Sequence, residues 1–270
     1  MSTDSPVRVV IVGAAGRMGK EALKALNAPP EIEIVGAVVR SQAGVSAQAL
    51  AGPTAVDLVL ESDLAAVLAR TKPDVLVDLS HHSVAVSNAR LATEVGTHVV
   101  IGCTGMEASE LSTIDELVTS AGVAAIYAPN FAIGAILMMR FAEIAAKWIP
   151  DVEIIEMHHD RKEDAPSGTA MHTADLIIAA RTGTPTEKPK TLYKLEGARG
   201  GEKEGVHVHS VRLPGLLAHQ QVIFGAPGEV LTIRHDAMDR SVYMGGLKLC
   251  VRRVSGLRGL VIGLDKLLFE

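Results

Sequence analysis

One window of the sequence, residues 153–170, holds more side chains suited to acid–base chemistry than any other. The apolar run at residues 152–157 predicts a buried strand, and two adjacent histidines, His158 and His159, stand at its end. Imidazoles exchange protons near neutral pH, and Lys162 adds a positive charge or a further proton. These residues predict a site for proton transfer at the end of a strand.

A short turn of small residues, Ser167, Gly168 and Thr169, follows and opens a helical pattern over residues 170–180. The first turn of a helix presents free N–H groups and the positive end of the helix dipole, which together suit a carboxylate. The alternative is structural, because strand ends often carry histidine and a serine or threonine here can simply cap the helix. Taken as a set, a proton donor, a cation and an anion cradle predict an enzyme for a carboxylated substrate.

Composition predicts an α/β protein with an aliphatic core. Of the 270 residues, 48% are hydrophobic but only 3% are aromatic, and valine-rich runs alternate with alanine-rich helical stretches. The length suits one large or two modest domains. The formal net charge of −5 and the lack of a basic patch argue against nucleic acid as the main partner.

Cysteine usage and hydropathy predict a cytoplasmic location. Cys103 and Cys250 lack C-x-x-C spacing, which favours a reducing compartment without structural disulfides or a cysteine zinc site. Residues 1–6 are short and polar, so no signal peptide is predicted. No apolar stretch is long and unbroken enough to predict a membrane span.

The beginning of the chain has the pattern of a dinucleotide-binding turn. A predicted strand at residues 7–12 runs into a glycine-rich turn at 13–19, and a helical pattern follows over 20–26. Without side chains, such a turn brings backbone N–H groups against a pyrophosphate. The spacing is G-x-x-G-x-x-G rather than the commonest form. The alternative is a tight turn whose glycines serve packing alone.

The end of the second predicted strand, residues 31–39, bears on the choice of nucleotide. In dinucleotide folds an acidic residue near this point usually binds the adenosine ribose. Here the strand ends in Val39 and Arg40, with no acid. Arg40 is placed to meet a 2′-phosphate, so the sequence favours NADPH. The alternative is that Arg40 is a solvated loop residue.

Further predicted strands end in small or polar residues, at the edge where open α/β sheets bind ligands. His81 and His82 have no carboxylate or cysteine partner at ligand spacing, so a loop near the cofactor is favoured over a metal site. Residues 102–105 form a small-residue turn in which Cys103 is interpreted as a packing residue rather than a nucleophile. Asn130 carries an amide that can meet the nicotinamide end of a cofactor.

The second half of the chain predicts a different architecture. A long apolar helix at residues 133–148 leads out of the first domain, and loops are predicted at 181–189 and 196–205. Closely joined strands are antiparallel, which predicts an antiparallel or mixed sheet with helices. The predicted strands are 206–213, 218–224 and 230–235, followed by a helix at 239–254 and an apolar tail at 259–268 that returns to the first domain.

With these motifs assembled, the chain resembles the dihydrodipicolinate reductase family, the 4-hydroxy-tetrahydrodipicolinate reductases of bacterial lysine and diaminopimelate synthesis. The resemblance covers nearly the whole chain and rests on Gly16-Arg17-Met18-Gly19, Gly102-Cys103-Thr104-Gly105, Asn130-Phe131, and above all Glu156-Met157-His158-His159 with Lys162 and Asp164-Ala165-Pro166-Ser167-Gly168-Thr169-Ala170. It implies a Rossmann-like parallel-sheet nucleotide-binding domain over residues 1–130 and 241–270. It also implies an α+β substrate and oligomerisation domain with a mixed sheet over 131–240, and a homotetramer.

The resemblance also implies a role for each matching residue. His158 takes the position of the catalytic acid/base, and Lys162 takes that of the second proton donor and charge partner. Substrate contacts are expected at His159, Ser167, Gly168 and Thr169. Cofactor contacts are expected at Gly13, Ala14, Ala15, Gly16, Arg17, Met18, Arg40, Gly102, Cys103, Thr104, Ala128, Pro129, Asn130 and Phe131. No metal ligand is expected.

The reaction implied by the family is reduction of 4-hydroxy-tetrahydrodipicolinate, a small dicarboxylate cyclic imine, to tetrahydrodipicolinate and water with NADPH or NADH. Three residues depart from common family patterns: Val39 stands where many members have an acid, Cys103 replaces a threonine, and Met157 replaces a small residue. Two other classes remain open. Another dehydrogenase would share the nucleotide half without needing the histidine cluster, and a nucleotide sensor would lack paired acid–base residues.

Overall fold

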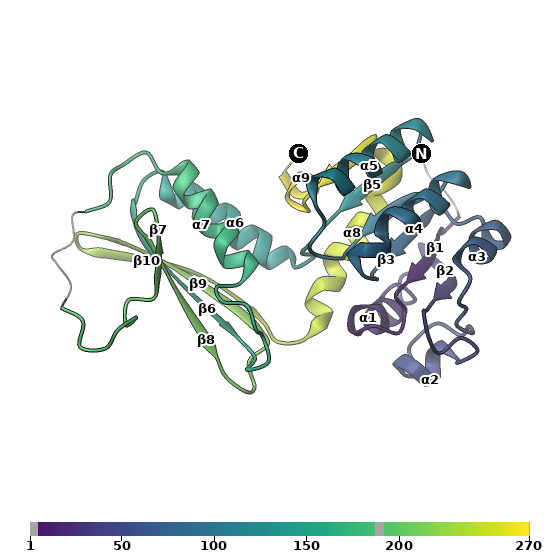
Figure 1. Cartoon of the computed structure of the whole chain (residues 1–270), viewed down its shortest axis with the longest axis horizontal. Coiled ribbons are helices and arrows are strands. Elements are labelled where there is room, and N and C mark those ends of the chain that lie inside the picture. The colour runs from purple at the N-terminus through teal and green to yellow at the C-terminus, as the bar shows by residue number, and fades with distance from the viewer. Residues whose placement is uncertain (1–4, 187–191, 270) are drawn as a thin grey trace. The chain divides into compact units, whose positions relative to one another are not determined.

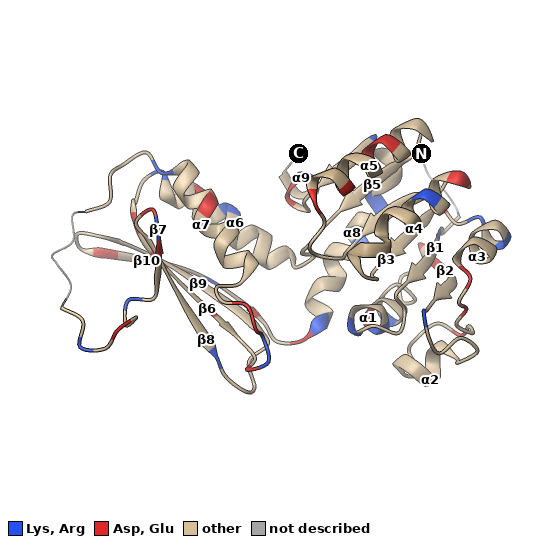
Figure 2. Cartoon of the chain, viewed as in Figure 1, with Lys and Arg blue, Asp and Glu red and all other residues tan. Residues whose placement is uncertain are grey.

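The computed structural model describes residues 5–186 and 192–269 and divides the chain into two compact units. Unit 1 comprises Met1–Ile133 and Arg240–Glu270, and unit 2 comprises Gly134–Asp239. Unit 2 is therefore an insertion in the sequence of unit 1. Acidic and basic side chains are interspersed over the helices and loops of both units (Figure 2). Within the described residues, no helix has both the length and the apolar character needed to cross a membrane.

Unit 1 is built on a six-stranded sheet with the order β11-β5-β4-β3-β1-β2 (Figure 1). Every neighbouring pair is parallel, and the order reverses beside β1, where a doubly wound sheet binds its ligand. This confirms the predicted Rossmann-like fold. The strands are β1 (Val7–Val12), β2 (Ile32–Val38), β3 (Val75–Asp78), β4 (His98–Ile101), β5 (Ala124–Tyr127) and β11 (Gly259–Ile262).

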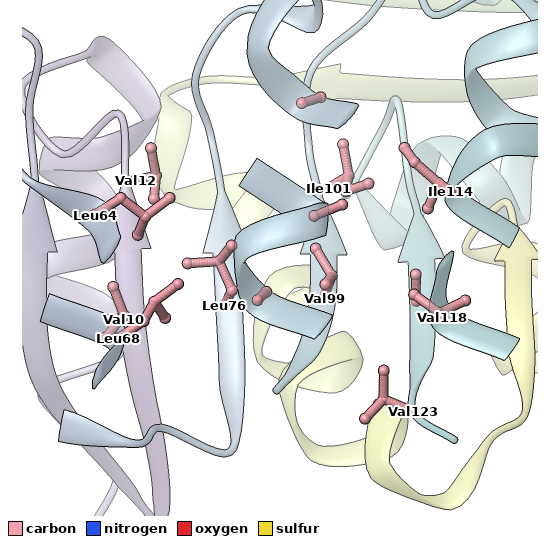
Figure 3. Packing of buried hydrophobic residues seen from close by; sticks show 14 of the residues in the cluster. Val10, Val12, Leu64, Leu68, Leu76, Val99, Ile101, Ile114, Val118 and Val123 are labelled. Atoms are coloured by element: carbon pink, nitrogen blue, oxygen red, sulfur yellow. The ribbon is translucent and has the colours of Figure 1, made fainter. Parts of the chain in front are cut away.

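Helices pack on the sheet of unit 1 because its strands are almost continuously apolar and must be covered on both faces. One of these packed faces is shown in Figure 3: Val10 and Val12 of β1 lie near Leu64 and Leu68 of α3. The helices are α1 (Arg17–Ala25), α2 (Ala47–Ala51), α3 (Leu64–Thr71), α4 (His82–Glu94), α5 (Ala108–Ser120), α8 (Met244–Arg253) and α9 (Asp265–Phe269), with 3-10 turns at Arg240–Tyr243 and Val254–Gly256.

Local capping explains where two of these helices begin. The Asp63 carboxylate accepts the backbone N–H of Ala66 at 3.0 Å, as expected for an N-cap of α3. Glu107 and Glu110 form a reciprocal capping box at the start of α5. The local sequence thus determines the helix boundaries that hold the loops at the carboxyl edge of the sheet.

Unit 2 contains a mixed five-stranded sheet with the order β10-β9-β6-β8-β7. Its central strand β6 is parallel to β8 and antiparallel to β9, which confirms the predicted mixed sheet. Helices α6 and α7 lie along one side of it (Figure 1). The elements are α6 (Ile133–Ala146), β6 (Asp151–His158), α7 (Gly168–Ala180), β7 (Gly201–Lys203), β8 (Val206–Arg212), β9 (Ala218–Ala226) and β10 (Glu229–Ala237).

Several predicted boundaries were wrong. The loop predicted at 196–205 contains β7, which pairs with β8, and the helix predicted at 239–254 is divided into a 3-10 turn and α8. α1 begins earlier than predicted, at Arg17. Of the loop predicted at 181–189, residues 181–186 form no helix or strand, and 187–189 lie outside the described residues. The predicted strands at 206–213 and 218–224 are not neighbours, because β6 lies between them.

Two adjacent glycines of α8 give a matched test of packing in unit 1. A Cβ at Gly246 would overlap the carbonyl oxygen of Phe131, whereas one at Gly245 would meet only Ile133 Cδ1 at 3.5 Å. Gly246→Ala should therefore lower the free energy of unfolding by about 2–3 kcal/mol. Gly245→Ala should stay within about 1 kcal/mol of the wild type. Urea denaturation followed by circular dichroism measures both, and equal stabilities would contradict the close packing.

Candidate active site

The end of β6 is organised by one buried carboxylate, that of Glu156, whose side chain has no exposed surface. Its Oε2 atom lies 2.5 Å from His158 Nδ1 and accepts Arg212 Nη1 at 2.9 Å. Its Oε1 atom accepts Arg212 Nη2 at 2.8 Å and the backbone N–H of Ser167 at 3.2 Å. The carboxylate therefore joins the end of β6, the end of β8 and the start of α7.

Glu156 remains ionised despite its burial. Burial raises the pKa of a carboxyl group because desolvation disfavours its charged form, but hydrogen bonds from His158, Arg212 and Ser210 outweigh that effect and lower the pKa of Glu156 to about 2. An ionised carboxylate only accepts hydrogen bonds, so Nδ1 of His158 must donate to it. Nε2 is then the nitrogen through which His158 can exchange a proton with a substrate.

The sequence interpretation missed both Glu156 and Arg212. Glu156 had a signal, because the period of two along a strand places it on the same buried face as Ile154, and a buried charge needs partners. Arg212 had no local signal. It lies opposite His158 in the pairing of β6 with β8, and it also donates to the backbone oxygen of Asp164 at 2.7 Å.

Lys162 is held by an exposed partner. Its Nζ atom donates to the two carboxylate oxygens of Asp164 at 2.6 and 2.7 Å, and this hydrogen bond lowers the pKa of Asp164. The Asp164 side chain is 65% exposed, whereas that of Lys162 is 21% exposed. Exposed ion pairs contribute little to stability, so a substrate carboxylate can compete with Asp164 for the ammonium group.

The Ser-Gly-Thr turn divides into a structural residue and an accessible one. Ser167 is 3% exposed, and its hydroxyl accepts the Ala170 N–H at 3.2 Å as the N-cap of α7. The structural alternative considered above thus describes this hydroxyl. Gly168 is exposed, and a Cβ built on it would meet no atom within 4 Å. Gly168 and Thr169 form the first positions of α7, where open space lies beside the N–H groups of the helix start.

His159 is partly exposed but has a buried Nδ1 atom without a hydrogen-bond partner among the described residues. The turn that follows it is closed by the Lys162 N–H, which donates to the His159 backbone oxygen at 3.2 Å. Leaving a buried polar atom unpaired is unfavourable. A ligand that supplied a partner would remove that cost, which fits the substrate contact expected at His159.

In unit 1, the glycine-rich turn combines close backbone packing with a helix start that has no side-chain cap. Gly13 has φ +77°, and a Cβ there would lie 2.6 Å from the Leu79 oxygen. A Cβ at Gly19 would lie 2.6 Å from Ala14 Cα. These two glycines are required for packing. Gly16, in contrast, is exposed and precedes α1 without any side-chain cap, so the first N–H groups of the helix are available to a phosphate. The residues present therefore fit a dinucleotide.

The two residues that follow β2, Val39 and Arg40, differ in exposure. Val39 is 3% exposed, and its N–H donates to the Glu61 oxygen at 2.8 Å. Arg40 is exposed. The chain then turns through Gln42 and Gly44, both with positive φ. Arg40 is therefore the side chain at this strand end that points to solvent, where the adenosine ribose of a bound dinucleotide is expected.

Small residues after β4 are explained in part by packing within unit 1. A Cβ at Gly102 would lie 2.6 Å from the ring of Phe131, which is itself only 2% exposed. Burial raises the pKa of Cys103 to about 11, so its thiol is protonated at neutral pH and poorly suited to be a nucleophile. The Asn130 side-chain oxygen accepts the Ala132 N–H at 2.9 Å and is thus engaged within the chain.

The histidine pair after β3 has a structural role at the start of α4. His81 Nδ1 accepts the Ser83 N–H at 3.3 Å, and its ring centroid lies 4.2 Å from that of His82. Across residues 5–186 and 192–269, no three or more His, Cys, Asp or Glu side chains are grouped so that they could hold a metal ion. The loop after β3 thus brings both rings to the same sheet edge as the glycine-rich turn.

Comparison with known proteins identifies the family of this chain. Family models described as dihydrodipicolinate reductase, N-terminus and C-terminus, match residues 7–131 and 134–268. The chain belongs to the dihydrodipicolinate reductase family. The 4-hydroxy-tetrahydrodipicolinate reductase of Moorella thermoacetica is 48% identical over 262 residues, which cover 97% of this chain and 98% of that protein. The enzyme of the same name from Syntrophomonas wolfei is 46% identical over 261 residues, with the same coverage.

Solved structures agree with the family. The dipicolinate-bound dihydrodipicolinate reductase from Paenisporosarcina sp. TG-14 is 38% identical and has a TM-score of 0.85, covering 97% of this chain and 99% of that one. The family predicted from the motifs is therefore confirmed, and so is the enzyme class, an NAD(P)H-dependent oxidoreductase of lysine and diaminopimelate biosynthesis. These matches favour the reductase over the dehydrogenase and sensor alternatives.

Proposed function

We propose that this chain reduces 4-hydroxy-tetrahydrodipicolinate to tetrahydrodipicolinate and water, with His158 as the acid that completes the reduction. The relatives with this activity in their names match almost the full length of the chain. The structural observation that carries the proposal is the imidazole of His158, held through Nδ1 by the buried Glu156 carboxylate at the end of β6. That arrangement leaves Nε2 as a proton donor.

The proposed reaction divides the work between the two units. Residues 1–130 and 241–270 bind the nucleotide, and residues 131–240 bind the substrate. The 4-hydroxy ring loses water to give a conjugated cyclic imine. NADPH or NADH bound to unit 1 would supply the hydride that reduces one of the two ring double bonds, and the other remains in the product. His158 then delivers a proton from Nε2 to the anionic carbon or nitrogen left by hydride addition, so that charge and atoms balance.

The proposed substrate site neutralises two carboxylates. Lys162 supplies a full positive charge once it exchanges Asp164 for a substrate carboxylate. The first turn of α7, at Gly168 and Thr169, supplies N–H donors in open space. His159 supplies the ring nitrogen that lacks a partner within the chain. Ser167 contributes by fixing the helix start rather than through its own capped hydroxyl.

The proposed nucleotide site uses the uncapped start of α1 and the loops after β2, β4 and β5. The pyrophosphate is surrounded by Gly13, Ala14, Ala15, Gly16, Arg17 and Met18, and the ribose is contacted by Arg40. The contacts near the nicotinamide come from Gly102, Cys103, Thr104, Ala128, Pro129, Asn130 and Phe131. Backbone groups make most of these contacts, because Cys103 and Phe131 are themselves buried. Arg40 favours NADPH over NADH.

Replacing the two proposed catalytic residues should give different kinetic signatures. His158→Ala should lower kcat by about 10²- to 10⁴-fold with little change in nucleotide affinity, because a general acid is lost. Lys162→Ala should lower kcat and also raise the substrate KM, because it removes charge from a dianion site. Both are measured from nucleotide absorbance with substrate made in situ from pyruvate and aspartate semialdehyde by its synthase. Wild-type constants in either variant would remove that residue from the mechanism.

Arg40→Ala should separate the two nucleotides. Loss of a guanidinium–phosphate contact should raise the KM for NADPH about tenfold or more and leave the KM for NADH nearly unchanged. Arg90→Ala removes the same charge from the exposed surface of α4 and serves as the control. Equal effects on both nucleotides would show that Arg40 does not contact the 2′-phosphate.

We further propose a homotetramer assembled through the unit 2 sheet, in the cytoplasm. In support, α6 and α7 lie along one side of this sheet (Figure 1). On the face away from Ile154 and Val222, which are fully buried, Ile155 and Ile223 are only half-buried. The two buried cysteines are free thiols, in keeping with a reducing compartment.

A charge on the uncovered sheet face should weaken the assembly. Ile223→Glu should shift the sedimenting mass from about four chains to a smaller species, because an unpaired charge is unfavourable in a buried interface. Val84→Glu, at an exposed position of α4 in unit 1, is the control and should sediment like the wild type. A wild-type chain that sediments as a monomer would contradict the proposal.

A further inference from the structure

We propose that Glu156 and Arg212 act together as a positioning pair that fixes the tautomer of His158 and tunes how readily it releases its proton. The inference rests on the proposed function of His158 and deepens it. Neither residue is expected to touch the substrate. Their effect would be transmitted through one imidazole, whose Nδ1 atom lies 2.5 Å from Glu156 Oε2.

The geometry fixes the ring. Residues 156 and 158 lie on the same face of β6, and Arg212 lies opposite His158 on β8. Arg212 grips Glu156 through two parallel N–H donors, at 2.9 and 2.8 Å, which sets the plane of the carboxylate. Because the carboxylate plane is set from β8, the direction of the His158 Nδ1–H bond is set as well. Nε2 takes no part in this hydrogen bond.

The charges of Glu156 and Arg212 together determine how easily His158 releases its proton. A lone buried carboxylate would hold an imidazolium so firmly that the proton would be hard to transfer. Arg212 is a permanent cation, and it already neutralises Glu156 through the bidentate contact. Glu156 therefore accepts a hydrogen bond from His158 as a full carboxylate, while Arg212 offsets its negative charge. His158 keeps its orientation and can still give up a proton.

Other charged groups lie on the loop that follows β6. The Asp164 backbone oxygen accepts from Arg212, and the Asp164 carboxylate is paired with Lys162. On the β9 side, the register partner of His158 is Ala218, which carries no charge. Among the described residues, the Glu156–Arg212 pair is thus the charged pair in hydrogen-bonded contact with the imidazole, through Glu156.

The same strand offers a matched control. Glu153 also contacts an arginine and a histidine: Arg199, and His209 through Nε2 at 2.9 Å. Glu153 lies three positions before Glu156, and because this offset is odd Glu153 lies on the opposite face of β6. Glu153→Gln therefore removes a carboxylate with the same kinds of partner from the same strand, while leaving His158 untouched.

The first test is kinetic. Glu156→Gln should lower kcat by about 10²-fold and leave the KM for NADPH unchanged, because orientation is lost while nucleotide binding is not. The alkaline limb of its kcat–pH profile should move to lower pH. Arg212→Lys, which keeps the charge but loses the bidentate grip, should lower kcat less. Glu153→Gln should match the wild type in kcat and in pH profile. An unchanged profile in Glu156→Gln would overturn the proposal.

The second test does not depend on activity. Two-bond ¹H–¹⁵N correlation spectra of the ¹⁵N-labelled wild-type protein report which ring nitrogen of a neutral histidine carries the proton, and the His158 signals are assigned by their loss in His158→Gln. We expect the Nδ1-protonated tautomer. The Nε2-protonated form would overturn the proposal even in an active enzyme. The expected tautomer in a protein that does not turn over the substrate would instead count against the proposed function.

Discussion

Unit 2 is organised around one ionised carboxylate, that of Glu156, whose side chain has no exposed surface. A buried charge persists only where donors surround it, and Glu156 meets that demand with a histidine, an arginine and a backbone N–H. Each donor comes from a different part of the unit. The end of β6, the end of β8 and the start of α7 must therefore converge before the charge is satisfied, and their convergence is what builds the site.

In unit 1 the candidate site is shaped by close packing of the backbone rather than by a buried charge. Its carboxyl edge is shaped by close approach of the backbone at Gly13, Gly19 and Gly102, where a side chain would overlap its neighbours. Such contacts leave helix starts and turns exposed as bare N–H groups, a surface that recognises a phosphate without side-chain specificity. In the proposed nucleotide site, discrimination between nucleotides is assigned to Arg40, a side chain outside the packed turn.

Local sequence predicted what local physics determines. The strands predicted at residues 7–12 and 31–39 correspond to β1 and β2. The adjacent histidines and Lys162 were evident because they are close in sequence. Arg212 was not, because its partner lies 56 residues away and only strand register brings the two together. The neighbours of β6 were also beyond local patterns, since a strand from earlier in the chain separates β8 from β9.

The return of β11 to unit 1 has a consequence for how the chain is made. β11 pairs with β5 along its whole length, yet the two strands are separated by all of unit 2. During synthesis, the edge of β5 that pairs with β11 therefore keeps its N–H and C=O groups unpaired while unit 2 emerges from the ribosome. Unit 2 is contiguous and can fold before β11, which follows it in the sequence, completes the Rossmann-like sheet. The unit that begins first in the sequence can thus be the second to complete its fold.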